Sequence, residues 1–559
     1  MPTLEEKEPA AETEERKPAP TRWALSLSHL GVVALWVPFF LLLCYLPLRA
    51  PELWGHLIYG EWILEHRSLP VEDPVMPVAE GMEVVDTVWL SQVILTVVDR
   101  AGGVPWLSVF FALTVLTTYL ILARAFFLAS GSKLASTLGV LAAFALSWGR
   151  STTLRPENFG SLCFAYLLLL LVKGSRSDDG GAAQRRLWYR VPLLFVLWAN
   201  LHGSFVWGLL LLGCFFLGRV IEVGRETKSA GRVAADRTVR RWLYLGEIGA
   251  AATLLNPYGI DLWLYVLGVG GRANLAILPE VQPLVIHGLP GVSFALSWVA
   301  LLILLRRSRR PLPAAHVLSL AAFGVAAAAG VGRLAWYGPV TALVLAPLVA
   351  ELADRARKGR RRPAPSEPQA GRFTAGPSWH YTLLGAILVW LGFAFSPFSA
   401  SLLGREPRTL GQFLGPDAPM AVSGFLAANP PRGPIFNPAD WGDWLALEGP
   451  SGLQPFVTSR LQLIPPRVWQ AYSRILWAGY EWETILERHT IETVVLDRLQ
   501  HQRLVRALSL AEGWNMTYND GAAMVFARAA DDGDEAGGGA SAGAAGAPPP
   551  SSTEGVEKR

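Results

Sequence analysis

Apolar stretches alternate with short polar connectors along most of this chain. A bilayer core of about 30 Å needs roughly 17–25 helical residues per span, and eleven stretches approach that length. Several are short for a span, so the count is expected to hold to within one or two. This pattern predicts a mainly α, polytopic transmembrane protein of about 11 spans. The expected spans are residues 24–47, 105–129, 133–149, 157–173, 188–201, 204–222, 242–256, 291–306, 312–330, 335–351 and 379–397.

The connectors differ in charge, and the difference predicts an orientation. Every other connector is rich in Lys and Arg, as cytoplasmic loops are. An N-terminus inside the cell places all of these connectors on the cytoplasmic side, and it places residues 49–104 and 398–530 outside. The basic connectors lie within residues 173–190, 225–241, 306–310 and 355–362.

Two short helices are expected in the first outer loop, 49–104. Residues Asp86–Asp99 read as an amphipathic helix, with Asp86 as its N-cap and Gly102 as its stop. The segment is too short and polar to span, so we expect it to lie along the outer membrane interface. The stretch Leu53–His66 reads as a second helix.

Beyond the last span the pattern changes to that of a small extracytoplasmic α/β domain, residues 399–530. A terminal hairpin, Trp514–Arg528, is expected to turn at Asn519-Asp-Gly521, because this sequence favours tight turns. The other expected elements are strands at 433–436, 455–458 and 493–496 and helices at 482–489 and 501–512.

Composition fits a membrane protein flanked by polar ends. Of 559 residues, 52% are apolar and only 17% charged, against roughly a quarter charged in soluble domains. The Glu/Lys/Pro-rich residues 1–22 are expected to be a disordered cytoplasmic N-terminus, and 23–398 the transmembrane domain. Residues 531–559 are expected to be a disordered tail.

Several chemical classes lack support in the sequence. The three cysteines lie inside apolar runs and indicate neither a disulfide framework nor a zinc site. There is no P-loop, dinucleotide fingerprint, His-Glu-x-x-His motif or Gly-x-Ser-x-Gly elbow. The net charge of +4 resides in the basic connectors, so no nucleic-acid partner is expected.

The first outer loop carries the strongest candidate chemistry. Glu52 follows the first span, and His56, Asp73 and Asp86 come after it. Carboxylates at a membrane surface can bind a divalent cation, such as Mg or Mn, or remove a proton from an acceptor hydroxyl. The structural alternative is that Glu52 and Asp86 only stabilise helix N-termini.

Arginines at outer boundaries run against the positive-inside trend. Arg150, Arg155 and Arg333 therefore need partners, and a lipid phosphate is one candidate. The alternative is an internal pair of Arg155 with Glu157 or Glu280.

Other polar residues fall at the same outer boundaries. His202 could donate to a phosphate or relay a proton, or it could be structural. The further candidates for substrate binding are His56, Glu157, Asn200 and Glu280. The external domain carries a further set of candidates for acceptor recognition, Asn437, Asp440, Trp441, Asp443, Trp444 and Arg460. Exposed Trp beside Asp and Asn would suit a carbohydrate, although Trp in a small domain is usually core.

The order of these motifs resembles a known family. An acid after the first span, a helix with Trp and His, Pro70-x-x-Asp73 and a loop-borne interfacial helix resemble the glycosyltransferase C superfamily, notably its bacterial mannosyltransferase-like members. A wider set of motifs resembles a poorly characterised group within it, over about residues 50–530. These motifs are Arg155-Pro-Glu-Asn158, Trp198-Ala-Asn-Leu-His-Gly203, Asn256-Pro-Tyr-Gly259 and Phe436-Asn-Pro-Ala-Asp-Trp-Gly-Asp443.

The resemblance implies an enzyme of the inner membrane. It would move a sugar from a polyprenyl-phosphate donor, a membrane lipid, to a glycan or protein acceptor at the outer face. The catalytic first-loop acid of the family maps to Glu52, and a second acid maps loosely to Asp73 or Asp86. The paired acids of some members are missing. A transporter or flippase of lipid-linked glycans and a non-catalytic glycan-binding subunit remain the alternatives.

Overall fold

A computed structural model describes residues 24–48, 51–176, 181–268, 278, 280–360, 378–404, 408–415 and 418–529. The expected disordered ends, 1–22 and 531–559, lie outside these residues. The described helices are α1 Leu27–Tyr45, α2 Glu52–His66, η1 Pro77–Ala79, α3 Trp89–Ser130, α4 Lys133–Leu146, α5 Trp148–Ser151, α6 Glu157–Arg176, α7 Ala182–Leu201, α8 Phe205–Thr227, α9 Ala230–Ala235, α10 Arg237–Ala252, α11 Asp261–Gly268, α12 Leu289–Arg307, α13 Ala314–Ala328, η4 Val331–Arg333, α14 Leu334–Arg360, α15 Trp379–Ala394, α16 Pro397–Leu403, α17 Leu410–Leu414, α18 Met420–Ala428, α19 Ala439–Glu448, η5 Leu461–Leu463, α20 Pro466–Leu476, α21 Trp482–Arg488 and α22 Gln502–Leu510.

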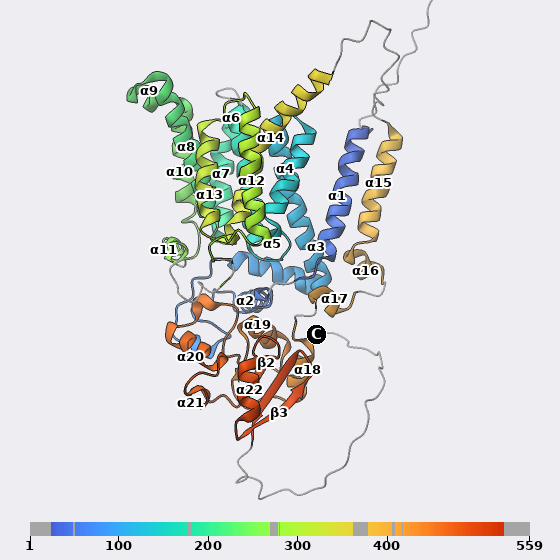
Figure 1. Cartoon of the computed structure of the whole chain (residues 1–559), viewed down its shortest axis with the longest axis vertical. Coiled ribbons are helices and arrows are strands. Elements are labelled where there is room, and N and C mark those ends of the chain that lie inside the picture. The colour runs from blue at the N-terminus through green and yellow to red at the C-terminus, as the bar shows by residue number, and fades with distance from the viewer. Residues whose placement is uncertain are drawn as a thin grey trace, which may run out of the picture.

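Every stretch expected to span the membrane contains a helix, and these helices form one bundle (Figure 1). Within the described residues, six helices are long and apolar enough to cross a bilayer, and a seventh span results if the bent pair α15–α16 counts as one. The expected count of about 11 is therefore higher than length and composition alone support. Helices such as α4 and α13 are apolar but shorter than a full span.

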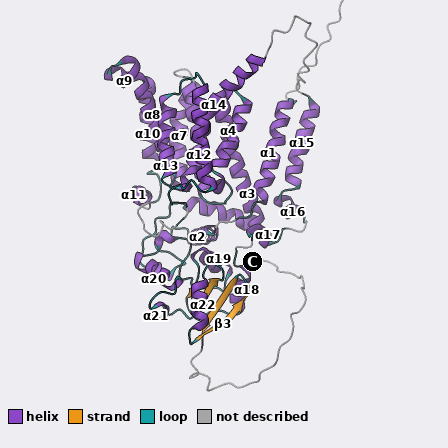
Figure 2. Cartoon of the chain, viewed as in Figure 1, coloured by secondary structure: helices purple, strands orange, loops and turns teal. Residues whose placement is uncertain are grey.

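A small mixed sheet stands at one end of the bundle (Figure 2). Its strands are β1 Ile435–Phe436, β2 Thr493–Asp497, β3 Trp514–Asn519 and β4 Ala523–Arg528. The order is β1-β2-β4-β3, with β1 parallel to β2 and the other neighbours antiparallel. The expected hairpin is confirmed, and Gly521 takes a positive φ of 91° at its turn. The expected strand at 455–458 is reduced to a bridge between Pro455 and Ile435.

The first outer loop lies between the bundle and this domain. Helix α2 and the first part of α3 run across the end of the bundle in Figure 1. The expected stop at Gly102 is a break inside α3, because Gly103 adopts a positive φ of 64°, and the chain then continues into the membrane. At Gly60 a Cβ atom would lie 2.1 Å from Thr96 Oγ1, so glycine permits the close approach of α2 to α3.

The loop and the domain share a hydrophobic core. Tyr59, Met76 and Val84 of the loop are buried in one cluster with Phe436 and Phe456 of the domain. Trp54 of α2 packs edge-on against Trp444 of α19, with ring centroids 4.8 Å apart. The domain is therefore held directly against the helices that carry the candidate residues.

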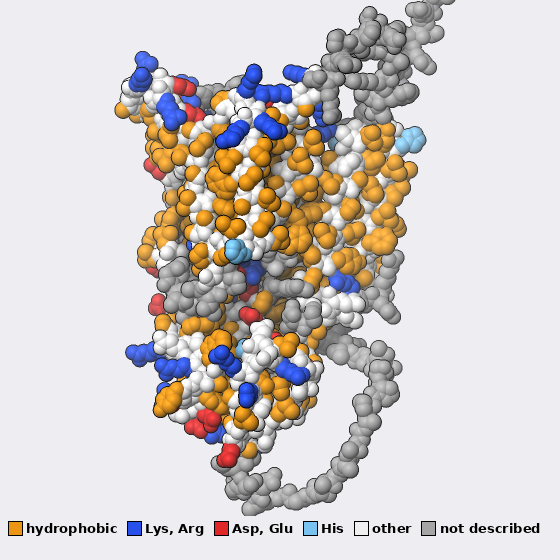
Figure 3. Space-filling model, viewed as in Figure 1, with side chains coloured by type: hydrophobic (Ala, Val, Ile, Leu, Met, Phe, Trp, Pro, Cys, Tyr) orange, Lys and Arg blue, Asp and Glu red, His pale blue; other side chains and the backbone are white. Residues whose placement is uncertain are grey.

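Charge separates the two ends of the bundle. Blue Lys and Arg side chains crowd the end away from the domain, above a broad apolar belt (Figure 3). The exposed apolar side chains of α12 and α15 belong to this belt, including Leu296 at 60% and Trp390 at 62% exposure. Such a belt fits a membrane protein, since soluble surfaces rarely expose patches of this size.

Candidate active site

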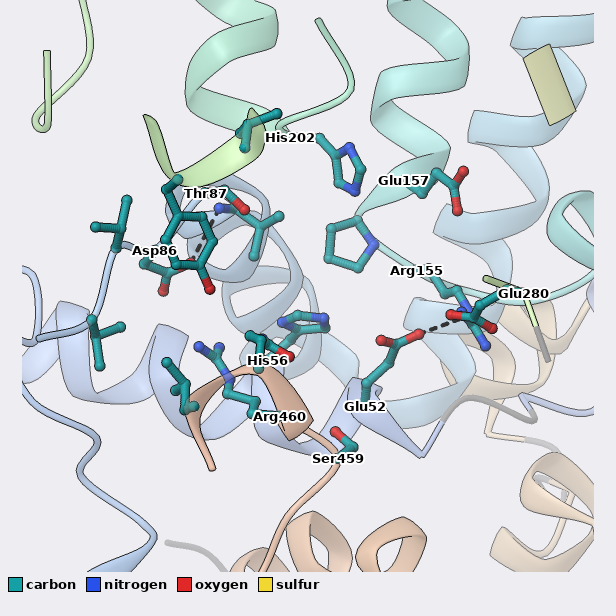
Figure 4. Close-up of a pocket in the computed structure, with 18 of the residues that line it drawn as sticks. Glu52, His56, Asp86, Thr87, Arg155, Glu157, His202, Glu280, Ser459 and Arg460 are labelled. Carbon is teal, nitrogen blue, oxygen red and sulfur yellow. Dashed lines mark hydrogen bonds and ion pairs between the residues drawn. The ribbon is translucent and has the colours of Figure 1, made fainter. Parts of the chain in front are cut away.

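A cavity of about 370 Å³ lies where the bundle, the first outer loop and the domain meet (Figure 4). Eight of the candidates from the sequence line it together. They come from α2, the loop before α3, the α5–α6 turn, the end of α7 and the loop before α12. These residues are Glu52, His56, Asp86, Arg150, Arg155, Glu157, His202 and Glu280.

On its bundle side the cavity is lined by a network of two arginines and three glutamates. Arg155 Nε lies 2.9 Å from Glu52 Oε1, and its Nη1 donates to Glu280 Oε1 at 3.2 Å. Arg150 pairs with Glu157 at 3.2 Å and with the same Glu280 oxygen at 3.4 Å. The predicted internal pair of Arg155 with Glu280 is confirmed, and the pairing with Glu52 is new.

The sequence Arg155-Pro-Glu-Asn158 fixes both arginines locally. Asn158 Oδ1 accepts from the Arg155 backbone N–H at 2.8 Å, and Asn158 Nδ2 donates to the Arg150 carbonyl at 3.3 Å. Glu157 opens α6, where an acid is favoured in the first turn. The backbone at both arginines is therefore held in place by Asn158.

Burial shapes the protonation of the groups in this cavity. It raises the pKa of Glu52, which Arg155 partly offsets. It lowers the pKa of His56, and it lowers that of His202 to about 4, so both imidazoles are neutral at pH 7. His202 Nδ1 accepts from the Ser204 N–H at 3.1 Å, which leaves the proton on Nε2 for donation to a ligand.

The domain side of the cavity is different, because Arg460 enters it from the domain. Its guanidinium stacks on Tyr59, with Cζ 3.3 Å from the ring centroid. Across the cavity, Asp86 Oδ1 accepts from the Val88 N–H and from Gln92 Nε2. Arg460 Nη2 and Asp86 Oδ2 are both buried and have no hydrogen-bond partner.

The backbone next to Arg460 is held by a buried carboxylate, that of Asp443. Asp443 Oδ2 accepts from the Ser459 N–H at 3.2 Å and from the Ser459 hydroxyl. Burial raises the pKa of Asp443 to about 7. A Cβ on Gly55 would lie 2.6 Å from Asp443 Oδ1, so α2 is in close contact with this support.

A second, more apolar cavity of about 250 Å³ adjoins the first and shares Arg150, Arg155 and Glu280 with it. Its remaining wall comes from α4, α5, α12 and α14, including Leu146, Trp148, Leu289 and Leu334. The shared arginines therefore stand where an apolar groove meets a polar pocket.

Comparison with known proteins identifies the fold. No protein-family model matches the chain, and no curated protein matches it. The Archaeoglobus fulgidus oligosaccharyltransferase, crystallised with a tethered acceptor peptide containing the NVT sequon, matches 90% of this chain and 74% of its own, at 13% identity and a TM-score of 0.53. The same enzyme in complex with an inhibitory peptide and a dolichol-phosphate matches 91% and 75%, at 14% identity and a TM-score of 0.52. The chain therefore shares its fold with this archaeal enzyme.

A further likeness is weaker. ArnT of Cupriavidus metallidurans, bound to undecaprenyl phosphate, matches 89% of this chain and 98% of its own, at 15% identity and a TM-score of 0.49. The fold assignment rests on the archaeal enzyme.

Three candidates from the sequence, Asp73, Arg333 and Asn200, do not line the cavity. Asp73 accepts from the Tyr59 hydroxyl at 2.5 Å and from the Val75 and Met76 N–H groups, so it shapes its loop and holds the ring beneath Arg460. Arg333 donates to the Ala326 carbonyl at 3.4 Å.

Asn200 also lies outside the cavity, because its amide is used in packing. It accepts from Trp89 Nε1 and donates to the carbonyls of Val196 and Leu255. The positions of Asp73, Arg333 and Asn200 in the sequence suggested the cavity, but their hydrogen bonds hold the three side chains outside it.

The tryptophans of the domain are core residues. Trp441 is 8% and Trp444 3% exposed, and Asp443 is 1% exposed. The alternative that they belong to the core is confirmed, and a sugar-stacking surface formed by exposed Trp441 and Trp444 is wrong. Apolar contact with α2 removes these rings from solvent.

Arg460 was predicted as an acceptor-recognition residue of the external domain, but the sequence did not place it, or Ser459, in one cavity with Glu52. The one local signal was a charged residue inside an apolar run, between Phe456-Val457 and Leu461. A buried arginine there requires a contact, and the ring on which it stacks, Tyr59, belongs to the first outer loop, far earlier in the chain.

The described residues contain no group of three or more His, Cys, Asp or Glu side chains arranged to hold a metal ion. The three glutamates of the cavity instead pair with two arginines, Arg150 and Arg155, which offset most of their charge. The expected Mg or Mn ion therefore does not fit this cluster as the side chains stand.

Proposed function

We propose that this protein is an integral membrane glycosyltransferase that moves a sugar from a polyprenyl-phosphate donor to an envelope acceptor at the non-cytoplasmic face of the inner membrane. One observation carries the proposal. Paired arginines shared by an apolar groove and a polar pocket suit a lipid phosphate, whose tail needs the groove and whose head needs the cations.

The donor phosphate would bind at Arg150 and Arg155, with His202 as a further donor. The two guanidinium groups would exchange glutamate oxygens for phosphate oxygens, so no bare charge need be exposed first. The polyprenyl chain would follow the groove between α4 and α12 towards the membrane. The dolichol-phosphate complex of the archaeal neighbour supports a lipid-phosphate ligand for this fold.

Glu52 would serve as the base. The acceptor hydroxyl oxygen would attack the anomeric carbon, its proton would pass to the Glu52 carboxylate, and the bond from that carbon to the phosphate oxygen would break. The phosphate would leave with the electron pair, stabilised by the arginines. Phosphate binding would draw Arg155 away from Glu52, and this loss of a cation would strengthen Glu52 as a base.

The placement of the polar groups favours this reaction over transport. A flippase would need polar groups near the middle of the bundle. Here they gather at the end that carries the domain.

The test uses the purified full chain in lipid nanodiscs with undecaprenyl phosphate as a binding probe, and sugar transfer from polyprenyl-phosphate sugars to envelope extracts. Glu52→Gln should abolish transfer and retain undecaprenyl-phosphate binding, whereas Arg155→Gln should weaken that binding. Normal transfer by Glu52→Gln would contradict the role of Glu52. Equal binding of undecaprenyl phosphate by wild type and Arg155→Gln would contradict the donor site.

A further inference from the structure

We propose that Asp86 and Arg460 form an acceptor subsite for a neutral, polyhydroxylated group, that is, adjacent hydroxyls of a glycan. The inference rests on the proposed function and names the acceptor class for the same pocket. It begins from two buried polar atoms, Asp86 Oδ2 and Arg460 Nη2, which have no hydrogen-bond partner and line one cavity.

Unpartnered buried charges are costly, and they call for a ligand. Asp86 is 2% and Arg460 8% exposed, so bulk solvent does not serve them freely. Figure 4 shows the Arg460 guanidinium below Asp86 among the side chains that line the cavity, with no hydrogen bond or ion pair drawn between the two. The space between them suits a group that bonds to both.

The chemistry of the two atoms limits what that group can be. Asp86 Oδ2 needs a donor, and Arg460 Nη2 needs an acceptor. A hydroxyl supplies both, and two adjacent hydroxyls can bridge a carboxylate and a guanidinium. A phosphate or carboxylate would bind Arg460 but would be repelled by Asp86. An ammonium group would bind Asp86 but would be repelled by Arg460. Burial raises the pKa of Asp86, and the positive charge of Arg460 opposes that rise. With Asp86 ionised the couple carries no net charge, so it favours a neutral ligand.

Both side chains are held in place before a ligand arrives. Asp86 lines the cavity, and its Oδ1 accepts from the Val88 N–H and from Gln92 Nε2, which leaves Oδ2 as the oxygen without a partner. Arg460 lies flat on Tyr59, whose hydroxyl is bonded to Asp73. Such preorganisation lowers the entropic cost of binding.

His56 adds a neutral donor between this subsite and Glu52. Its Nδ1 lies 3.3 Å from Gln92 Nε2, which can only donate, so the proton of the neutral ring sits on Nε2. An acceptor sugar held by Asp86 and Arg460 would therefore meet further hydrogen-bonding groups on the path to Glu52.

The experiment measures glycoside binding by saturation-transfer NMR with the full chain in nanodiscs. The probes are the methyl glycosides of mannose, glucose and galactose, their mono-deoxy analogues, and inorganic phosphate. Wild type should bind at least one neutral glycoside, and loss of one hydroxyl should weaken binding. Arg460→Gln and Asp86→Asn should each weaken it by about tenfold or more, since each removes a bond to a charged group.

Arg503→Gln is the matched control, because Arg503 stacks on the exposed Trp477 of the same domain. It should bind the glycoside normally. Arg460→Lys keeps the positive charge but loses the paired N–H donors of the guanidinium, so it should fold and still bind the glycoside weakly.

Two results would overturn the subsite: glycoside binding unchanged in Arg460→Gln, or binding of inorganic phosphate and of no neutral glycoside. Undecaprenyl-phosphate binding, measured in parallel, reports the donor site alone. Its loss from Arg155→Gln but not from Arg460→Gln keeps a failure of the subsite distinct from a failure of the proposed function.

Discussion

The two sides of the pocket differ in how their charged side chains are paired. On the bundle side, Arg150 and Arg155 are already paired with three glutamates. On the domain side, Asp86 and Arg460 each keep a polar atom without a partner. A paired network can exchange one anion for another at small cost, whereas an unpaired couple gains most from a neutral ligand that bridges it. The contrast fits the separate donor and acceptor sites that we propose.

The largest expected effect is a loss of sugar transfer without a loss of donor binding, on the bundle side of the pocket. Glu52→Gln should lower transfer by roughly 10²–10⁴-fold, the usual contribution of a general base. Glu61→Gln on the same helix is the control, because Glu61 is exposed and pairs with Arg100. Initial rates of sugar transfer measure both, and a non-catalytic scaffold would be indifferent to either change.

The next effect concerns the support of Arg460 on the domain side. Asp443 has a pKa near 7 against an ordinary 3.8, so the folded protein holds this proton more tightly than the unfolded chain. Stability should therefore be highest below about pH 4 and fall as the pH rises to about 7, by up to about 4 kcal/mol. Asp443→Asn should flatten this dependence.

Thermal unfolding of the full chain at a series of pH values measures this effect. Asp497→Asn, at the end of β2, is the control and should keep the wild-type slope. A slope that survives in Asp443→Asn would show that other groups cause it.

The third effect tests the exchangeable network. Arg155→Gln removes a charged partner of the lipid phosphate, so undecaprenyl phosphate should bind about 10–100-fold more weakly. Arg333→Gln is matched in type and lies outside the cavity, so it should bind normally. Equal losses in both variants would remove the distinction between these arginines.

The smallest effect probes the contact that joins the two sides. Gly55→Ala would push a methyl group against Asp443 and should lower stability by about 1–3 kcal/mol. Gly424→Ala in α18 meets no atom within 4 Å and should be neutral or slightly stabilising. Thermal unfolding distinguishes them, and equal shifts would mean that α2 does not press on the domain.

The sequence by itself determined the helices and the hairpin, because hydropathy and turn chemistry are local. Asn519 Oδ1 accepts from the Gly521 N–H within the turn itself, and Asn158 Oδ1 accepts from the Arg155 N–H within its own motif. Gly102 correctly marked a break, since the backbone is non-helical at Gly102 and Gly103 and a second helical segment follows.

Only the tertiary structure decided which polar groups meet. Asp73 follows Glu52 in the first loop, yet it accepts hydrogen bonds from the Tyr59 hydroxyl and the Val75 N–H and lies outside the cavity. Arg460 enters the cavity from a distant segment, because the domain packs on α2 through Trp54 and Trp444. The partner of a charged side chain depends on which segments the hydrophobic core brings together, and no local pattern records that.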